Sequence, residues 1–250
     1  MSSTGVKLVR LARKHLGEKY VLGALAPKNN SQWKGPWDCA EFVSWLVFQS
    51  TGRLYGCNND DGNPSAADAF TGFWARDARS LGKIISIEQA ARTPGAAVLR
   101  IPKPGAIGHI AVSDGKGGTV EAHSSARGVI THTLSDRRWD MSILVPFIEY
   151  QEGDDSPVTP PRKTVFRFTE PLMRGPKVKE IQQRLKSAGF HPGNSDGVFG
   201  ALTHAAVLAF QISRRLVPDG EVGPQTARAL GIRLDASVPR LSRRPRRSRG

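Results

Sequence analysis

A polar, proline-rich stretch divides the chain into two parts. Residues 151–163 read QEGDDSPVTPPRK, with no apolar periodicity and with prolines at positions 157, 160 and 161. Prolines favour an extended backbone, so this composition is typical of a semi-stiff linker. A chain of 250 residues has room for two ordinary domains. We therefore predict one domain over residues 1–150, a linker over 151–163, a second domain over 164–233 and a basic, disordered tail over 234–250.

The first part of the chain has helical patterns early and strand patterns late. Apolar residues recur at helical spacing in residues 4–16, and residues 39–50 form a second apolar, helical segment. Residues 54–94 contain a loop, CNNDDGNPS, followed by a helical segment, AADAFTGFWARDARSLG. After residue 95 come four strand-like segments, separated by turns that contain glycine: AAVLRI, HIAVS, TVEAH and GVITHTL. Helices followed by an antiparallel sheet predict an α+β domain.

The second part contains an internal repeat. The segments DGVFGALT (196–203) and DGEVGPQT (219–226) share the pattern Asp-Gly-x-apolar-Gly-x-x-Thr, 23 residues apart. Asp-Gly favours a tight turn because glycine tolerates positive φ, and a helix start follows each turn. Another helix, opened by Pro176 and closed by Gly189, precedes both copies. The pattern predicts a small all-α domain of three short helices over residues 164–233.

The positive charge is concentrated in the second part. The net charge is +14; residues 1–150 carry +5, from 18 basic and 13 acidic side chains, and the last 100 residues carry +9. Six arginines lie in the final segment, RLSRRPRRSRG. Such a balance favours polyanions, among them nucleic acid, anionic lipid and the anionic polymers of a bacterial envelope. No nucleic-acid recognition motif accompanies the charge and the tail has no aromatic residues, so we predict no nucleic-acid partner.

One of the two cysteines stands at a predicted helix start. In WDCAEFVSW, Asp38 is placed to cap the helix, and Glu41 three residues later completes the pattern of a capping box. Cys39 is then the first helical residue, where unpaired amides and the helix dipole favour a thiolate, the nucleophilic form. Cys57 lies in YGCNND without a capping signal, and we interpret it as a packing residue. The pattern predicts Cys39 as a nucleophile.

A thiolate nucleophile needs a base, and the histidine that opens HIAVS fits this role. His109 begins an alternating strand, and the next strand, TVEAH, places Thr119, Glu121 and His123 on one face. A three-residue loop 114–116 would put Glu121 opposite His109, whereas a five-residue loop 114–118 would put His123 there. Either Glu121 or His123 could therefore orient the imidazole, as the third member of a catalytic triad does.

The second part resembles the three-helix peptidoglycan-binding domain found on many bacterial cell-wall hydrolases. The resemblance runs in register from Leu172 to Leu230 and includes both copies of the repeat. The positions that carry it are Gly175, Val178, Ile181, Gln182, Leu185, Gly189, Asp196, Gly197, Phe199, Gly200, Thr203, Phe210, Gln211, Asp219, Gly220, Gly223 and Thr226. Most of these residues build turns and a core, so peptidoglycan binding is implied by the resemblance.

The first 150 residues resemble the NlpC-type cell-wall cysteine peptidases, which have a papain-like fold. The matching segments are YVLG (20–23), DCAEFVSW (38–45), PGAAVLR (94–100), GHIAVSDG (108–115) and VEAHSSARGV (120–129). The resemblance implies that Cys39 attacks, that His109 is the base, and that Tyr20 and Asp38 belong to the pocket for the substrate amine. The spacing usual in the family places the orienting residue at Glu121.

This second resemblance implies a peptidoglycan hydrolase. Its members cleave stem-peptide amides, commonly between D-glutamate and the diamino acid. Where the family usually has serine-glycine after the cysteine, this chain has Ala40-Glu41, and the segment between Cys39 and His109 is long. Both departures bear on substrate choice. Two alternatives stay open: an N-acetylmuramoyl-L-alanine amidase of the same fold, and a non-catalytic wall-binding protein.

The sequence also sets expectations for location and partners. No apolar run is long enough to span a membrane, and basic residues at 7, 10, 13 and 14 interrupt the N-terminus where a secretory signal would need an apolar core. We expect synthesis in the cytoplasm without a Sec signal, non-classical release and action at the bacterial cell wall, as for an endolysin. The expected partner is peptidoglycan, with anionic envelope polymers as a further class, bound by a monomer. A zinc site of His109, Glu121 and His123 would leave Cys39 without a role, so we predict no metal and no cofactor.

Overall fold

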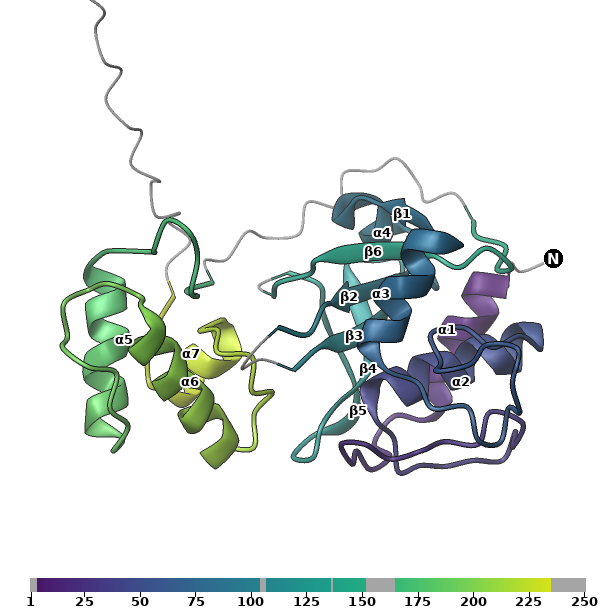
Figure 1. Ribbon diagram of the computed structural model, residues 1–250, viewed down its shortest axis with the longest axis horizontal. Coiled ribbons are helices and arrows are strands. Elements are labelled where there is room, and N and C mark those ends of the chain that lie inside the picture. The colour runs from purple at the N-terminus through teal and green to yellow at the C-terminus, as the bar shows by residue number, and fades with distance from the viewer. Residues whose placement is uncertain (1–3, 104–106, 136, 152–164, 235–250) are drawn as a thin grey trace, which may run out of the picture.

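The computed structural model describes residues 4–103, 107–135, 137–151 and 165–234, which form two units with separate hydrophobic cores (Figure 1). The N-terminal unit has helices α1 (Thr4–Lys14), α2 (Cys39–Thr51), α3 (Thr71–Ser80) and α4 (Ile87–Arg92). Its strands are β1 (Lys83–Ile85), β2 (Ala97–Arg100), β3 (His109–Ser113), β4 (Gly118–Ser124), β5 (Gly128–Thr133) and β6 (Met141–Leu144). The C-terminal unit has α5 (Pro176–Ser187), α6 (Ala201–Ser213) and α7 (Pro224–Ala229). Apart from residues 151 and 234, the predicted linker and tail lie outside the described residues.

The six strands form one antiparallel sheet in the order β1-β6-β2-β3-β4-β5. Helices α1 and α2 pack on the β3–β4 part of this sheet, whereas α3 lies nearer β1 and β2. The predicted α+β class, with an antiparallel sheet and a separate helical unit, is confirmed. Three short elements, β1, α4 and β6, were not expected from the sequence, and α3 begins five residues later than the predicted segment.

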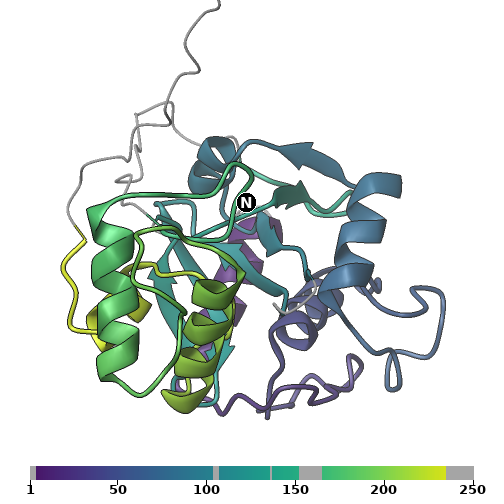
Figure 2. The same ribbon diagram turned by 60° about the vertical axis from the view of Figure 1, so that its left-hand side comes forward.

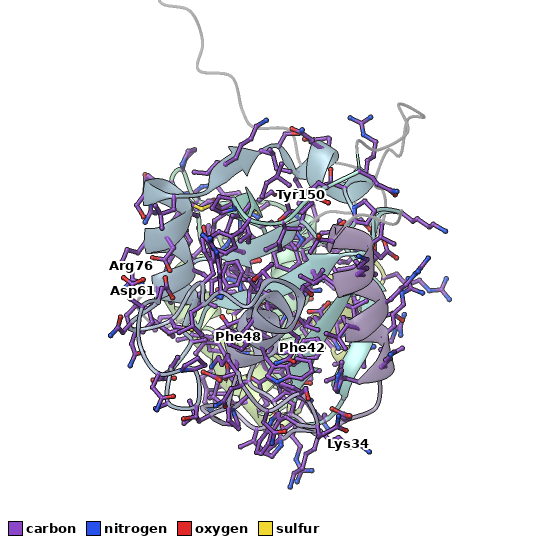
Figure 3. All side chains as sticks on the ribbon, turned by 90° about the vertical axis from the view of Figure 1, so that its right-hand side faces the viewer. Lys34, Phe42, Phe48, Asp61, Arg76 and Tyr150 are labelled. Carbon is purple, nitrogen blue, oxygen red and sulfur yellow. The ribbon has the colours of Figure 1, made fainter. Side chains whose placement is uncertain are left out.

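Helix α2 is the central element of the N-terminal unit because it is apolar on nearly all sides. Phe42, Trp45 and Leu46 are fully buried, as is expected for a helix without a polar face. Figure 3 shows Phe42 and Phe48 among the packed side chains, whereas Lys34 and Asp61 lie at the outer edge. The helix begins at Cys39 and ends at Gly52, whose φ of 72° closes it in the left-handed conformation. Burial on all sides fixes the helix, and with it the position of Cys39.

Glu41 has a different role from the one predicted. The predicted capping box is wrong: the Asp38 side chain does cap the helix, accepting from the Ala40 N–H at 3.0 Å, but Glu41 points into the protein. Its Oε2 accepts from the Ala26 N–H at 2.7 Å and from the Lys28 ammonium, and its Oε1 accepts from the Ala69 N–H. Because this carboxylate is buried, three partners compensate for its lost hydration, and the contacts hold two long loops against α2.

The sequence repeat of the C-terminal unit is a repeated hydrogen-bond network. In the first copy, the Gln182 amide donates to Asp196 Oδ1 at 2.9 Å and to Thr203 Oγ1 at 3.0 Å, and its oxygen accepts from the Gly197 N–H. In the second copy, Gln211 makes the corresponding bonds to Asp219 Oδ1 at 2.7 Å, Thr226 Oγ1 at 3.0 Å and the Gly220 N–H. A glutamine on one helix therefore holds the turn that starts the next helix. The side-chain amide of each buried glutamine both donates and accepts hydrogen bonds, which explains why the glutamine, aspartate, glycine and threonine recur together.

No helix within the described part of the chain combines the length and the apolar character needed to cross a membrane.

Candidate active site

The Cys39 thiol lies where the first turn of α2 meets strand β3. Cys39 is 6% exposed, and the backbone N–H of Ile110, the second residue of β3, is placed to hydrogen-bond its sulfur. His109 opens the same strand and is 2% exposed. The structure therefore places the predicted nucleophile beside the residue that follows the predicted base in β3, although the two positions are 70 residues apart in the chain.

A buried carboxylate holds the far side of the His109 ring. His109 Nε2 contacts Glu121 Oε2 directly, which leaves Nδ1 as the other ring nitrogen. The Glu121 side chain is 0% exposed, and it also accepts from Thr119 Oγ1 at 2.7 Å and from Arg137 Nη2 at 2.7 Å. Arg137 donates to both carboxylate oxygens, the bidentate geometry that guanidinium favours. A chain His109–Glu121–Arg137 is thereby fixed behind the site.

The strand register does not by itself choose the partner of His109. β3 and β4 pair Val112 with Val120 and Ser113 with Thr119, so the connecting loop is 114–118, the longer of the two alternatives. Continued along the strands, this register puts His123 opposite His109, yet Glu121 makes the contact, as a diagonal neighbour. β4 is irregular between Ala122 and Ser124, and the His123 ring lies 6.0 Å from His109, edge to face. The expectation that the residue opposite would orient His109 is therefore wrong.

His123 is a neighbour of the site and does not hold His109. Its Nδ1 contacts Ser124 Oγ at 3.1 Å, and its ring stacks on His132 with centroids 5.8 Å apart. Burial lowers the pKa of His123 to about 2, so the ring is uncharged at neutral pH.

The two residues expected in the amine pocket lie beside the thiol. Asp38 lies close to both Tyr20 and Cys39, and its charge raises the pKa of each of these two side chains. The Asp38 carboxylate is used twice more, since Oδ1 caps α2 and Oδ2 accepts from the Gly23 N–H at 3.0 Å. Burial raises the pKa of Tyr20, and the negative charge of Asp38 adds to this, so the phenol stays protonated. Asp38 and Cys39 both line a pocket of about 450 Å³.

The electrostatics favour a neutral Cys39–His109 pair at rest. Burial raises the pKa of the Cys39 thiol well above its ordinary value, Asp38 raises it further, and the Ile110 N–H and Arg100 oppose this only in part. Burial also lowers the pKa of His109, although Glu121 acts against it. The predicted thiolate is therefore not the resting form, because the cost of burying a charge exceeds the stabilisation from the helix start.

Glu121 stays ionised despite complete burial. Burial alone would raise the pKa of its carboxyl, but Arg137 and the hydrogen bond with His109 hold that pKa well below its ordinary value. Sequence reasoning missed Arg137, which follows β5 in a segment with no motif. It also missed Trp139, whose ring lies under the Arg137 guanidinium at 4.6 Å and beside His109 at 6.2 Å. Across the described residues, no three His, Cys, Asp or Glu side chains are grouped so that they could hold a metal ion.

Comparison with known proteins identifies the C-terminal segment first. Residues 174–230 match the family model described as "Putative peptidoglycan binding domain". The chain is also 41% identical over 69 residues to the N-acetylmuramoyl-L-alanine amidase CwlM of Mycobacterium tuberculosis (strain ATCC 25618 / H37Rv). That match covers 28% of this chain and 17% of the amidase, so the chain spans about a sixth of the length of this relative.

Similar solved structures cover the N-terminal unit. The NlpC/p60 domain of the peptidoglycan hydrolase SagA is 23% identical, with a TM-score of 0.40, over 56% of this chain and 98% of that chain. The P60 domain from the M. avium subspecies paratuberculosis antigen MAP1204 is 18% identical, with a TM-score of 0.40, over 57% of this chain and 95% of that chain. The predicted resemblance of the C-terminal segment to a peptidoglycan-binding domain is found in the family model that matches residues 174–230.

Proposed function

We propose that the protein is a peptidoglycan hydrolase that cleaves a stem-peptide amide by a Cys–His thiol mechanism and is held on the wall by its C-terminal unit. The observation that carries the proposal is the buried chain Glu121–His109 behind the capped Cys39, at the edge of a pocket. The match of residues 174–230 to a peptidoglycan-binding domain supports the same substrate.

The mechanism follows from the neutral resting pair. His109 takes the thiol proton while Cys39 Sγ attacks the amide carbonyl carbon, because a free thiolate would be costly in this buried position. Glu121 stabilises the imidazolium that forms, and Arg137 keeps that carboxylate ionised. N–H groups at the start of α2 face the developing oxyanion. His109 then gives its proton to the leaving amine, which leaves a thioester on Cys39.

The second half of the reaction restores the enzyme. A water molecule attacks the thioester carbonyl while His109 takes the proton of that water. Collapse of the intermediate breaks the carbon–sulfur bond, the carboxylic acid product leaves, and the proton returns to the Cys39 sulfur. The protein's own groups therefore account for every proton transferred.

Within this class we propose a D-glutamyl–diamino acid endopeptidase. Asp38, which lies close to Tyr20 and Cys39, is a suitable partner for a substrate ammonium group, which supports cleavage of a peptide with a free amine nearby. The amidase named among the relatives provides the second candidate, cleavage between muramic acid and L-alanine. We propose further that the protein acts on the cell wall as a monomer.

The test compares the two cysteines, which are both free and buried. Cys39→Ala should abolish release of soluble muropeptides from purified sacculi, whereas Cys57→Ala should retain it, because Cys57 is packed in the hydrophobic core and its thiol donates to the Tyr55 carbonyl. Mass spectrometry of the released fragments identifies the bond that is cut. Equal loss of activity in both folded variants would refute the assignment of the nucleophile.

A further inference from the structure

The pocket beside Cys39 is built by both units of the chain. Besides Asp38 and Cys39 it is lined from the N-terminal unit by Leu22, Phe70 and Lys103, among others. From the C-terminal unit it is lined by Leu208 and Ile212 of α6 and by Pro218 of the following loop. The segment matched to a peptidoglycan-binding domain therefore supplies one wall of the space into which the thiol opens.

Two ion pairs join the units at this place. Arg100 at the end of β2 donates to Asp219 Oδ2 at 2.6 Å, and Arg138 lies 3.2 Å from Glu221 Oε1. Figures 1 and 2 show the C-terminal unit beside the ends of β2 and β3, where these contacts lie. The Arg100 side chain is 3% exposed, and its Nε and Nη2 have no hydrogen-bond partner among the residues that the structure describes. Asp219 is thus the anion that offsets the cost of burying this guanidinium.

The side chains from the C-terminal unit leave the pocket beside Cys39 open. Leu22, Phe70 and Ile212 come from three separate segments, and they are 64%, 49% and 65% exposed although each lines the same space. A contact made only to join two units would bring such side chains together and bury them. Their exposure around a space of about 450 Å³ is instead typical of a binding groove that awaits a ligand.

We propose that the C-terminal unit completes the peptide groove, with Leu208, Ile212 and Pro218 forming the wall against which a peptidoglycan stem peptide lies. The inference rests on the proposed function, and it assigns to this unit a substrate contact in addition to anchoring. The chemistry of the groove matches that peptide, because an aliphatic lining suits alanyl and diamino acid side chains. Asp38 suits an ammonium group, and Lys103 suits a carboxylate.

The experiment uses the full chain and a soluble tetrapeptide stem, L-alanyl-γ-D-glutamyl-diamino acid-D-alanine, which carries no glycan. An anchor alone would not affect hydrolysis of this substrate. Ile212→Ser should raise KM about fivefold through the lost apolar contact. The control is Leu202→Ser on the same helix, at 64% exposure and away from the pocket, which should leave KM within about twofold because exposed sites contribute little.

A second pair of variants tests the ion pair that positions the wall. Asp219→Asn keeps the side-chain oxygen that the turn requires but removes the charge facing Arg100, and should raise KM about tenfold. The control is Asp196→Asn, because Asp196 makes the same bonds within its own turn and lies in the other copy of the repeat. If Ile212→Ser and Asp219→Asn match their controls, the groove has no such wall and the inference is overturned.

Binding distinguishes failure of this inference from failure of the proposed function. In the Cys39→Ala background, calorimetry with the same tetrapeptide measures the groove without cleavage. The wild type could fail to cleave any substrate while the tetrapeptide still binds and Ile212→Ser weakens that binding about fivefold. This result would support the groove and refute the hydrolase assignment. If the wild type cleaves sacculi but the tetrapeptide binds equally well to all variants, the hydrolase assignment is supported. The proposal that the C-terminal unit forms one side of the groove is then refuted. If no variant binds the tetrapeptide, the proposed contact between the C-terminal unit and the stem peptide is also refuted.

Discussion

Charges of both signs act on the imidazole of His109. Burial lowers its pKa, the Glu121 carboxylate raises it, and Arg137 lowers it again. Since Arg137 is paired with Glu121, the imidazole experiences a carboxylate whose charge is partly neutralised. This balance keeps His109 neutral and able to accept the thiol proton, while the carboxylate still stabilises the imidazolium formed during the reaction.

We expect variants of these two partners to shift the pH profile in opposite directions. Glu121→Gln removes the charge that raises the pKa of His109, so the acidic limb of kcat/KM should move to lower pH while kcat falls roughly 100-fold. Arg137→Met removes a charge that lowers this pKa, so the acidic limb should move to higher pH. The measurement is the rate of stem-peptide hydrolysis from pH 4 to pH 9.

His123→Ala serves as the comparison, because His123 lies on the same strand and is buried without holding the base. It should cost less activity than Glu121→Gln. If both variants retain full activity, another residue orients His109, and if Glu121→Gln leaves the acidic limb unmoved, the carboxylate is only structural.

Cys39 and His109 could be selected as candidates from the sequence because each lies in a local pattern, a capped helix start and the first position of an alternating strand. Arg137 could not, because it lies in an irregular segment after β5 and meets Glu121 only through the fold. The choice between Glu121 and His123 stayed open in the strand pattern for a related reason. A diagonal contact and the irregularity at Ala122–Ser124 decide it, and neither is visible in a strand pattern.

At the scale of elements, long helices were predictable and short elements were not. α2 is thirteen residues long and α6 is also thirteen, which is enough for periodicity and end signals to agree. β1, α4 and β6 are three, six and four residues long, too short for a period to stand out. Pairing of β1 with β6 and of β6 with β2, and not local preference, fixes these two strands.

The buried Lys28–Glu41 pair gives the main prediction at this scale. Lys28→Met would leave the Glu41 carboxylate without its charged partner, and we expect a loss of about 3–5 kcal/mol in the free energy of unfolding at pH 7. Burial already raises the pKa of Glu41, and without Lys28 it would rise further. The loss should therefore shrink as the pH falls through the raised folded-state pKa toward 4.5, and it should be smallest below 4.5, where Glu41 is protonated in both the folded and the unfolded state. Urea unfolding at pH 4 and pH 7 measures both quantities.

The control for this prediction is the double variant Lys28→Met, Glu41→Gln. It removes both charges, so it should be more stable at pH 7 than Lys28→Met alone. A double variant that is less stable than the single one would contradict the account of an uncompensated buried charge.

At the scale of the whole molecule, the proposed arrangement would couple cell-wall binding to catalysis at two levels. Binding of residues 174–230 to the polymer would raise the local concentration of stem peptides near Cys39. The arginine-rich segment 240–250, which lies outside the described residues, adds positive charge that is screened by salt. A contact made by turns and packed helices should respond to salt far less than a contact made by exposed arginines.

We expect a sacculus pull-down to separate these contributions. The Cys39→Ala chain lacking residues 240–250 should still bind at both 0.1 M and 1 M salt, since the Debye length falls from about 10 Å to about 3 Å and affects mainly exposed charges. The chain with the segment should bind more strongly at low salt only. If binding requires residues 240–250 and vanishes completely at high salt, charge alone attaches the chain to the sacculus.

The duplicated turn of the C-terminal unit has a consequence for how such a module can change. In each copy one aspartate oxygen, Oδ1, is committed to folding, because the glutamine and the turn amide both depend on it. The other carboxylate oxygen, Oδ2, takes no part in these bonds. At Asp219 it reaches Arg100 of the neighbouring unit, whereas Asp196 keeps the same inner bonds without that task. In each copy, the oxygen that holds the turn is therefore distinct from the oxygen that faces outward. One copy can gain a contact with a neighbouring unit without losing the hydrogen bonds that both copies need to fold.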